Sequence, residues 1–197
     1  SYRIQVYLED ITHNGSFFYY NSDFVLVANA LSEEYLCRLV EGAIKRGKRR
    51  MPGLQLCVGI GSRCMDISQL SVSYQRAKAA AHIAMTQKKQ VVKFDDCGLF
   101  RLLYMVEDKG ILREMETECL AALEEHDRRY NADYVDTLQS YLKHDGSIQA
   151  VAAELYTHRN TVLYRIGNIR KILGNELKTP EERLPYQIAF YIRRMHK

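Results

Sequence analysis

The chain has no apolar run that approaches the roughly 20 residues needed to cross a bilayer as a helix, and no charged-then-apolar leader opens it. Its five cysteines form no CxxC pair, and their odd number fits neither a disulfide framework nor a zinc site. We therefore expect reduced thiols in a cytoplasmic protein that makes no membrane contact. Because the first residue is Ser1 rather than Met, we also expect a missing upstream region.

Signatures of metal and nucleotide sites are equally scarce. The six histidines occur in no HExxH pattern or other metal-binding spacing. Residues 59–62 lack the third glycine and the lysine of a phosphate-binding loop, so we interpret them as a strand end and a turn. The sequence predicts no metal, no cofactor and no catalytic residue.

Charge is unevenly distributed along the 197 residues. Residues 143–197 hold ten Lys and Arg against five Asp and Glu, a net charge of +5, whereas residues 1–142 sum to −1. A basic excess confined to one segment is typical of a surface that meets a polyanion. The basic run 45–50 closes a predicted helix, where cations complement the helix dipole, and we interpret it as a solvated helix end.

The first hundred residues mix strand and helix patterns. A strand is predicted around residues 4–8, and two more flank a tight turn at Asn21 and Ser22. Further elements are predicted as helices over residues 32–50 and 66–87 and strands over residues 54–60 and 91–94. Strands interrupted by two long helices predict an α+β domain over residues 1–98, with an antiparallel or mixed sheet covered on one face.

From about Leu99 onward the pattern is helical. Residues 99–132 are predicted to form a connector, and the apolar stripe of its long helix, residues 111–130, is expected to pack on one of two domains. Residues 133–197 are predicted to form a compact all-α domain. Its first helix ends at Asp145 and Gly146, and its last helix begins with a capping box at residues 179–182.

Residues 147–174 carry the most informative pattern. Ser147 can cap a helix whose apolar residues recur at helical spacing up to Leu155, and a second apolar stripe runs from Val162 until Gly174. Two short helices joined by about three residues form a helix-turn-helix. Tyr156 stands in the turn, where glycine is common, and predicts a turn without a positive φ.

The second of these helices presents a polar face opposite its apolar stripe. Asn160 there can read adenine through its amide, and residues at the start of the helix can reach bases or phosphates. Arg165 lies nearer the stripe, so it could instead pair with Glu154 inside the protein. The candidate DNA-binding residues are Thr157, His158, Arg159, Asn160, Thr161, Tyr164, Arg165 and Lys171.

Several short strings in this region together resemble one family. They resemble the C-terminal DNA-binding domain of the purine catabolism regulator and carbohydrate diacid regulator (PucR/CdaR) family of bacterial transcription factors. This resemblance implies a sequence-specific regulator that binds double-stranded DNA. The matching strings are residues 137–142, 152–155, 158–162, 164–166 and 173–174, together with Ala189.

The front of the chain is similar to the middle domain of the same family, a degenerate relative of the GGDEF diguanylate cyclase fold. The similarity is carried by residues 20–27, 58–61 and 70–81. In an active cyclase, two hairpin glycines admit a guanine nucleotide and an acidic pair helps to hold divalent metal. Asn21 and Ser22 replace those glycines here and Phe24 replaces the glutamate. The resemblance therefore implies that catalysis is lost.

The sequence is compatible with more than one class of function. We expect a homodimer, because one recognition helix reads few base pairs whereas a twofold pair reads two half-sites, and we expect a small-molecule effector to be sensed outside this chain. One alternative is a guanine-nucleotide-binding or diguanylate-cyclase-like signalling domain, which the substitutions at residues 21–24 count against. Another is a structural helical adaptor, which would lack the basic excess and the polar face at Asn160 and Tyr164.

Overall fold

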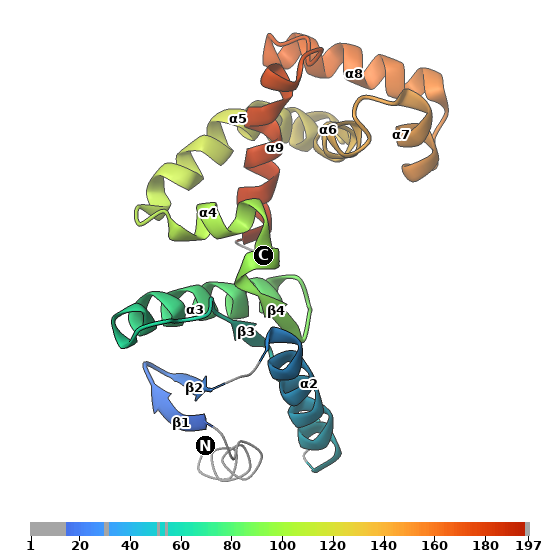
Figure 1. Cartoon of the computed structure of the whole chain (residues 1–197). Coiled ribbons are helices and arrows are strands. Elements are labelled where there is room, and N and C mark those ends of the chain that lie inside the picture. Colours follow the sequence, from blue (N-terminus) through green and yellow to red (C-terminus); the bar gives the residue numbers. More distant parts are fainter. Residues whose placement is uncertain (1–14, 30–31, 51, 54, 196–197) are drawn as a thin grey trace. The chain divides into compact units, whose positions relative to one another are not determined.

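The structure is a computed structural model that describes residues 15–29, 32–50, 52–53 and 55–195 (Figure 1). The chain divides into two compact units, Ser1–Arg101 and Leu102–Lys197. Among the described residues, every strand lies in the first unit and the second is helical, so the chain is an α+β protein with an all-helical segment. The strand predicted around residues 4–8 lies outside the described residues.

The first unit begins with the predicted hairpin. Strands β1 (Gly15–Tyr20) and β2 (Asp23–Ala28) pair antiparallel, and the turn residues Asn21 and Ser22 have φ values of 47° and 68°. Positive φ at both positions matches the right-handed twist of a two-residue hairpin. The hairpin is held by helix α3 (Leu70–Thr86), whose Tyr74 hydroxyl donates to Asp23 Oδ2 at 2.9 Å.

Strands β3 (Val58–Ile60) and β4 (Val91–Lys93) form a second, parallel pair. The single antiparallel or mixed sheet that the sequence predicted is not formed by the described strands, which make two separate two-stranded sheets. The reason is the connection: β3 and β4 are joined through α3, and a helical crossover brings strands together in parallel. A Cβ atom at Gly59 would lie 2.0 Å from the Ala77 carbonyl oxygen, so α3 rests directly on the β3 backbone.

Of the two helix starts predicted in the first unit, one lies where it was predicted and the other is shifted. Helix α2 (Glu33–Arg50) is capped by Ser32, whose Oγ accepts from the Tyr35 amide at 3.2 Å. Asp66 and Gln69 bracket a short 3-10 turn, η1 (Ile67–Gln69), so α3 begins one turn later than the sequence predicted. A second such turn, η2 (Phe94–Cys97), cuts short the strand predicted over residues 91–94.

The second unit packs its helices around one apolar core. Helix α4 (Leu99–Met105) spans the division between the units, and the others are α5 (Lys109–Tyr130), α6 (Tyr134–Lys143), α7 (Ile148–Glu154), α8 (Arg159–Leu173) and α9 (Pro180–Met195). The long helix that the sequence offered as a connector packs within this unit. The fully buried side chains of the core include Leu120, Leu123, Leu138, Val151, Val162, Ile169 and Leu177.

Helix α9 closes this core by packing against α5, which it crosses at an angle (Figure 1). The predicted capping box starts it: the Thr179 Oγ1 accepts from the Glu182 amide at 3.2 Å, and Glu182 Oε2 accepts from the Thr179 amide at 3.3 Å. Near its other end, the Arg193 guanidinium donates to Glu116 at 2.8 Å and to Glu124 at 2.5 Å. Two acidic residues of α5 therefore hold α9 through one cation.

Candidate nucleic-acid interface

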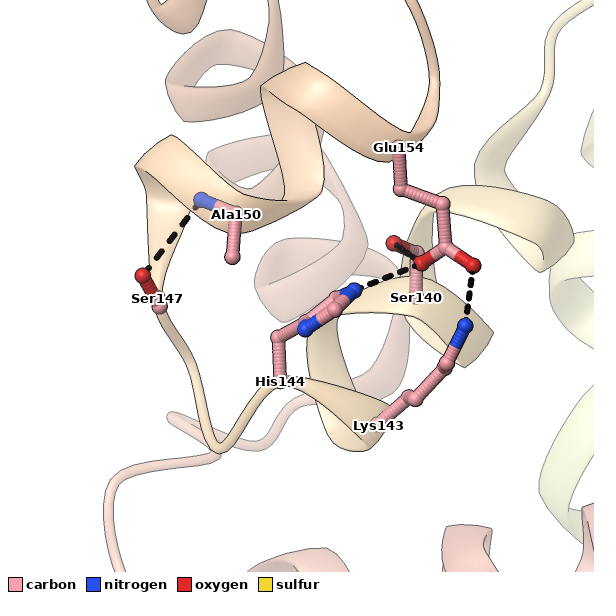
Figure 2. Close-up of polar contacts among 6 residues, drawn as sticks. All are labelled: Ser140, Lys143, His144, Ser147, Ala150 and Glu154. Atoms are coloured by element: carbon pink, nitrogen blue, oxygen red, sulfur yellow. Dashed lines mark hydrogen bonds and ion pairs between the residues drawn. The ribbon is translucent and has the colours of Figure 1, made fainter.

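Helices α7 and α8 form the predicted helix-turn-helix. Ser147 caps α7, its Oγ accepting a hydrogen bond from the Ala150 amide at 3.4 Å (Figure 2). The apolar stripe of α8 is buried as predicted, with Val162, Ile166 and Ile169 facing the core. Gly174 ends α8 with a left-handed φ of 61°. One side of α8 is therefore buried against the core, and the opposite side is exposed and could bind a ligand.

The turn between the two helices differs from the prediction. Tyr156 has a φ of 50°, so the expectation of a turn without a positive φ was wrong. The Tyr156 amide donates to the Ala153 carbonyl at 3.4 Å, and the Thr157 amide donates to the Ala152 carbonyl at 3.0 Å. This pair of bonds is a Schellman motif, which requires a left-handed residue directly after the C-cap of the helix. Tyr156 therefore occupies the position that glycine usually fills.

His158 serves as the N-cap of α8. Its Nδ1 accepts a hydrogen bond from the Asn160 amide at 3.2 Å, and its carbonyl oxygen accepts from the amides of Thr161 and Val162. The sequence had placed His158 only among the DNA-contacting candidates. A cap formed through Nδ1 gives this side chain a structural role as well.

The exposed side of α8 brings most of the sequence-predicted residues together. Tyr164 is 69% exposed, and Thr157, just before the helix, is half-buried. Among the described residues, neither Arg159 nor Lys171 has a salt-bridge partner, so both charges are available to phosphates. The exposed candidates on the helix are Arg159, Asn160, Thr161, Tyr164 and Lys171.

Arg165 is set apart from this group. Its Nη2 donates to Asp133 Oδ2 at 2.7 Å and its Nη1 donates to the buried Thr137 Oγ1 at 3.3 Å. The internal pairing that the sequence suggested exists, but the suggested partner, Glu154, was wrong. Asp133 precedes α6, so the guanidinium ties α8 to the helix packed beneath it.

Glu154 instead joins α7 to α6 (Figure 2). Its carboxylate accepts from Lys143 Nζ at 2.5 Å and from Ser140 Oγ at 2.6 Å, and lies 2.8 Å from His144 Nε2. The hydrogen bond from Lys143, followed by that from Ser140, lowers the pKa of Glu154 to about 2. Sequence reasoning missed this cluster, although Ser140, Lys143 and His144 lie at the i, i+3, i+4 spacing of one helix face.

Further hydrogen bonds fix α8 on α6 along its length. The Asn168 amide donates to the Tyr134 hydroxyl at 2.9 Å, and the Arg170 guanidinium donates to the Tyr141 hydroxyl at 3.2 Å. Asp127, in α5, accepts from the amide of Tyr134 at 2.9 Å and so caps α6. Hydrogen bonds to α6, together with the apolar core of the second unit, therefore fix the orientation of the exposed face of α8.

The first unit offers no comparable site in its described part. The carboxylate of Asp23 accepts from Tyr74 and forms a salt bridge with Lys78 at 3.3 Å, so its charge is used within the fold. No group of three or more metal-type side chains gathers among the described residues. Within the same residues, no helix has the length and apolar character needed to span a membrane.

Comparison with known proteins identifies the helical region. Residues 134–192 match the family described as the PucR C-terminal helix-turn-helix domain. This range runs from the start of α6 into α9 and includes the whole helix-turn-helix. Residues 134–192 therefore form a helix-turn-helix domain of the PucR type.

Similar proteins carry regulatory names. The chain is 29% identical over 123 residues to the proline-responsive transcriptional activator PutR of Bacillus subtilis, a match covering 61% of this chain and 30% of PutR. It is 25% identical over 155 residues to the DNA-binding transcriptional activator AdeR of the same organism, covering 77% of this chain and 36% of AdeR. It is 28% identical over 141 residues to the purine catabolism regulatory protein of B. subtilis, covering 70% and 26% of the two chains. This chain thus spans about a third of the length of the curated relatives it matches.

A solved structure, the regulator of polyketide synthase expression from Bifidobacterium adolescentis, aligns with 98% of this chain and 78% of that one. The sequence identity is 17% and the TM-score is 0.39.

Proposed function

We propose that this chain is part of a sequence-specific, DNA-binding transcriptional regulator of the PucR/CdaR type that reads duplex DNA through α8. The observation that carries the proposal is the PucR-type domain at residues 134–192, in which α8 buries its apolar stripe and exposes Asn160, Tyr164 and Lys171. The names of PutR, AdeR and the purine catabolism regulatory protein support it. The protein then acts in the bacterial cytoplasm, where chromosomal DNA lies.

The exposed side chains suit different parts of a DNA surface. Asn160 can pair with an adenine edge through both amide atoms, and Arg159 can pair with guanine or with a phosphate. Lys171 is a point charge suited to phosphate, and Thr157, Thr161 and Tyr164 can donate hydroxyl hydrogen bonds. His158 holds the helix start in place, as its cap shows. Arg165 positions α8 from within the protein.

We propose that the whole regulator is a homodimer with an effector-sensing region outside this chain. One helix contacts few base pairs, and a twofold pair of helices would read two half-sites of an operator. The three curated relatives extend well beyond the matched part, which leaves room for such a region in the whole protein.

We propose that the first unit is a GGDEF-like domain without catalytic activity. Asn21 and Ser22 keep the left-handed hairpin conformation without the glycines that would let a nucleotide approach. Asp23, the carboxylate that remains in this hairpin, is neutralised by Lys78 and bonded by Tyr74. These contacts favour a structural role for the hairpin over the nucleotide-signalling alternative.

The test of DNA reading is the variant Asn160→Ala. Duplexes that the wild-type chain enriches from a random library would serve as operator, and scrambled duplexes as reference. Because Asn160 is exposed and its cap contact uses the backbone amide, the free energy of unfolding should change by less than about 0.5 kcal/mol. Loss of a bidentate base contact should cost about 1–3 kcal/mol on the enriched duplex and much less on the scrambled one.

Two control variants show what a neutral change and an unfolding change look like in the same assays. Gln139→Ala removes an exposed amide from α6 and should leave both affinities unchanged. Val162→Asp places a charge in the buried stripe and should unfold the domain, because the carboxylate finds no partner there. Equal affinity of wild type and Asn160→Ala for the enriched duplex would refute this placement of the reading face.

A further inference from the structure

Tyr156 combines two unfavourable features at one position. Its ring is 97% exposed, and its backbone has the left-handed φ of 50°. In that conformation the β-carbon of an L-residue crowds the backbone, so glycine or asparagine is preferred after a helix end. A bulky aromatic residue with positive φ is an outlier that persists when it has a use.

The fold gives Tyr156 no use of its own. With almost all of its surface in water, the ring contributes no packing to the core of the second unit. Among the described residues, no side chain forms a hydrogen bond with its hydroxyl or stacks on its ring. The Schellman bonds at this turn involve backbone groups alone, and a glycine would form them equally well.

The location of Tyr156 identifies a partner of defined chemistry. The residue lies in the turn between α7 and α8, two positions before the His158 cap and four before Asn160. In a docked helix-turn-helix, the start of the second helix meets base edges while the first helix crosses the sugar-phosphate backbone. The turn joining them therefore lies beside the backbone, where a phenol hydroxyl meets phosphate oxygens, which are acceptors only.

We propose that the Tyr156 hydroxyl donates a hydrogen bond to a DNA phosphate, and that this contact accounts for a tyrosine in the left-handed turn. The proposal rests on the proposed DNA-binding function of α8 and adds a residue that positions the protein on the duplex. A phosphate contact carries no base information, so Tyr156 strengthens binding to every sequence alike.

The experiment compares Tyr156→Phe and Tyr156→Gly with wild type in the full chain. Affinities are measured over a range of salt concentrations for an enriched duplex and a scrambled duplex, and thermal unfolding is recorded in parallel. Tyr35→Phe, which removes the hydroxyl of an exposed tyrosine in the first unit, is the matched control and should leave binding unchanged.

Tyr156→Phe should weaken binding to both duplexes about tenfold, the effect of losing one hydrogen bond to a charged group. The slope of log affinity against log salt should stay constant, because a neutral phenol displaces no counterion. Tyr156→Gly should weaken binding at least as much while raising the melting temperature, because glycine relieves the backbone strain. A variant with a higher melting temperature and a lower affinity for DNA has lost a contact to DNA and has kept its fold.

Different results would contradict different parts of the proposal. If wild type binds DNA and Tyr156→Phe binds both duplexes equally well, the phosphate contact does not exist. A loss confined to the enriched duplex would assign Tyr156 to a base edge and overturn the contact to phosphate. A lower melting temperature for Tyr156→Gly would show that the tyrosine stabilises the turn. Failure of wild type to bind any duplex would instead remove the proposed function.

Discussion

The ion pair between Arg165 and Asp133 links α8 to the start of α6, and the coupling energy between the two side chains can be measured. We expect Arg165→Met to destabilise the second unit while leaving the electrostatic part of DNA binding unchanged. The Arg165 side chain is 22% exposed and Asp133 is 62% exposed, so solvent screens their attraction. Met keeps most of the aliphatic stem, which limits the effect to the lost guanidinium contacts.

The magnitude follows from the two contacts. A pair this exposed on one side contributes about 0.2–1 kcal/mol, and the second hydrogen bond, to the buried Thr137 hydroxyl, adds about 0.5–1.5 kcal/mol. Arg165→Met should therefore cost about 0.7–2.5 kcal/mol of unfolding free energy. For a unit of this size, each kcal/mol lowers the melting temperature by about 4–8 °C.

A double-mutant cycle separates the pair from its surroundings. Asp133→Ala is a suitable partner variant, because the Asp133 side chain makes no capping bond to α6. Thermal unfolding of the two single variants and the double variant should give a coupling of about 0.2–1 kcal/mol. A coupling near zero would contradict the pairing. A salt slope of DNA binding that falls by about 0.9 in Arg165→Met would show that Arg165 contacts a phosphate instead.

Two further predictions concern titration and catalysis. The pKa of Glu154 lies at about 2 instead of 4.5, so its stabilisation is complete above about pH 5 and is lost as pH falls towards 2. Melting curves of wild type should decline more steeply over that window than those of Glu154→Gln; parallel declines would contradict the role of Lys143 and Ser140. Incubation with GTP and Mg²⁺ should yield no cyclic dinucleotide, because Asn21 and Ser22 stand in place of the hairpin glycines and Phe24 stands in place of the second carboxylate. Any product above the blank, detected by chromatography, would restore the enzyme alternative.

The helix-turn-helix could be predicted because its signals are local. Caps such as Ser147 and Thr179 act within three residues, and the stripe of α8 repeats with the helical period. The partner of Arg165 could not be predicted this way. Periodicity gives the face of a side chain, but Asp133 lies 32 residues away in sequence, and only the packing of α8 on α6 brings it close.

Two backbone features were missed for a related reason. The φ of Tyr156 is set by the Schellman bonds that let α7 end and α8 begin within a few residues, a demand that overrides the preference of the tyrosine itself. The parallel pairing of β3 and β4 depends on the crossover through α3, whereas a strand pattern alone states no direction. The glycine at 59 was correctly interpreted as belonging to a strand, and its close contact with α3 explains why a side chain is absent there.

Helix α9, which Arg193 ties to Glu116 and Glu124 of α5, is the last helix of the second unit to be synthesised. Helix α9 supplies Ala189 and Phe190 to the same core that buries α8, yet it follows α8 in the chain. During translation, α8 thus leaves the ribosome before the helix that completes its support has been made. Since a domain folds as a unit, a nascent chain ending before Arg193 would carry Asn160 and Tyr164 on a helix that is not held in a fixed position. Premature termination in α9 should therefore abolish the DNA binding proposed for α8.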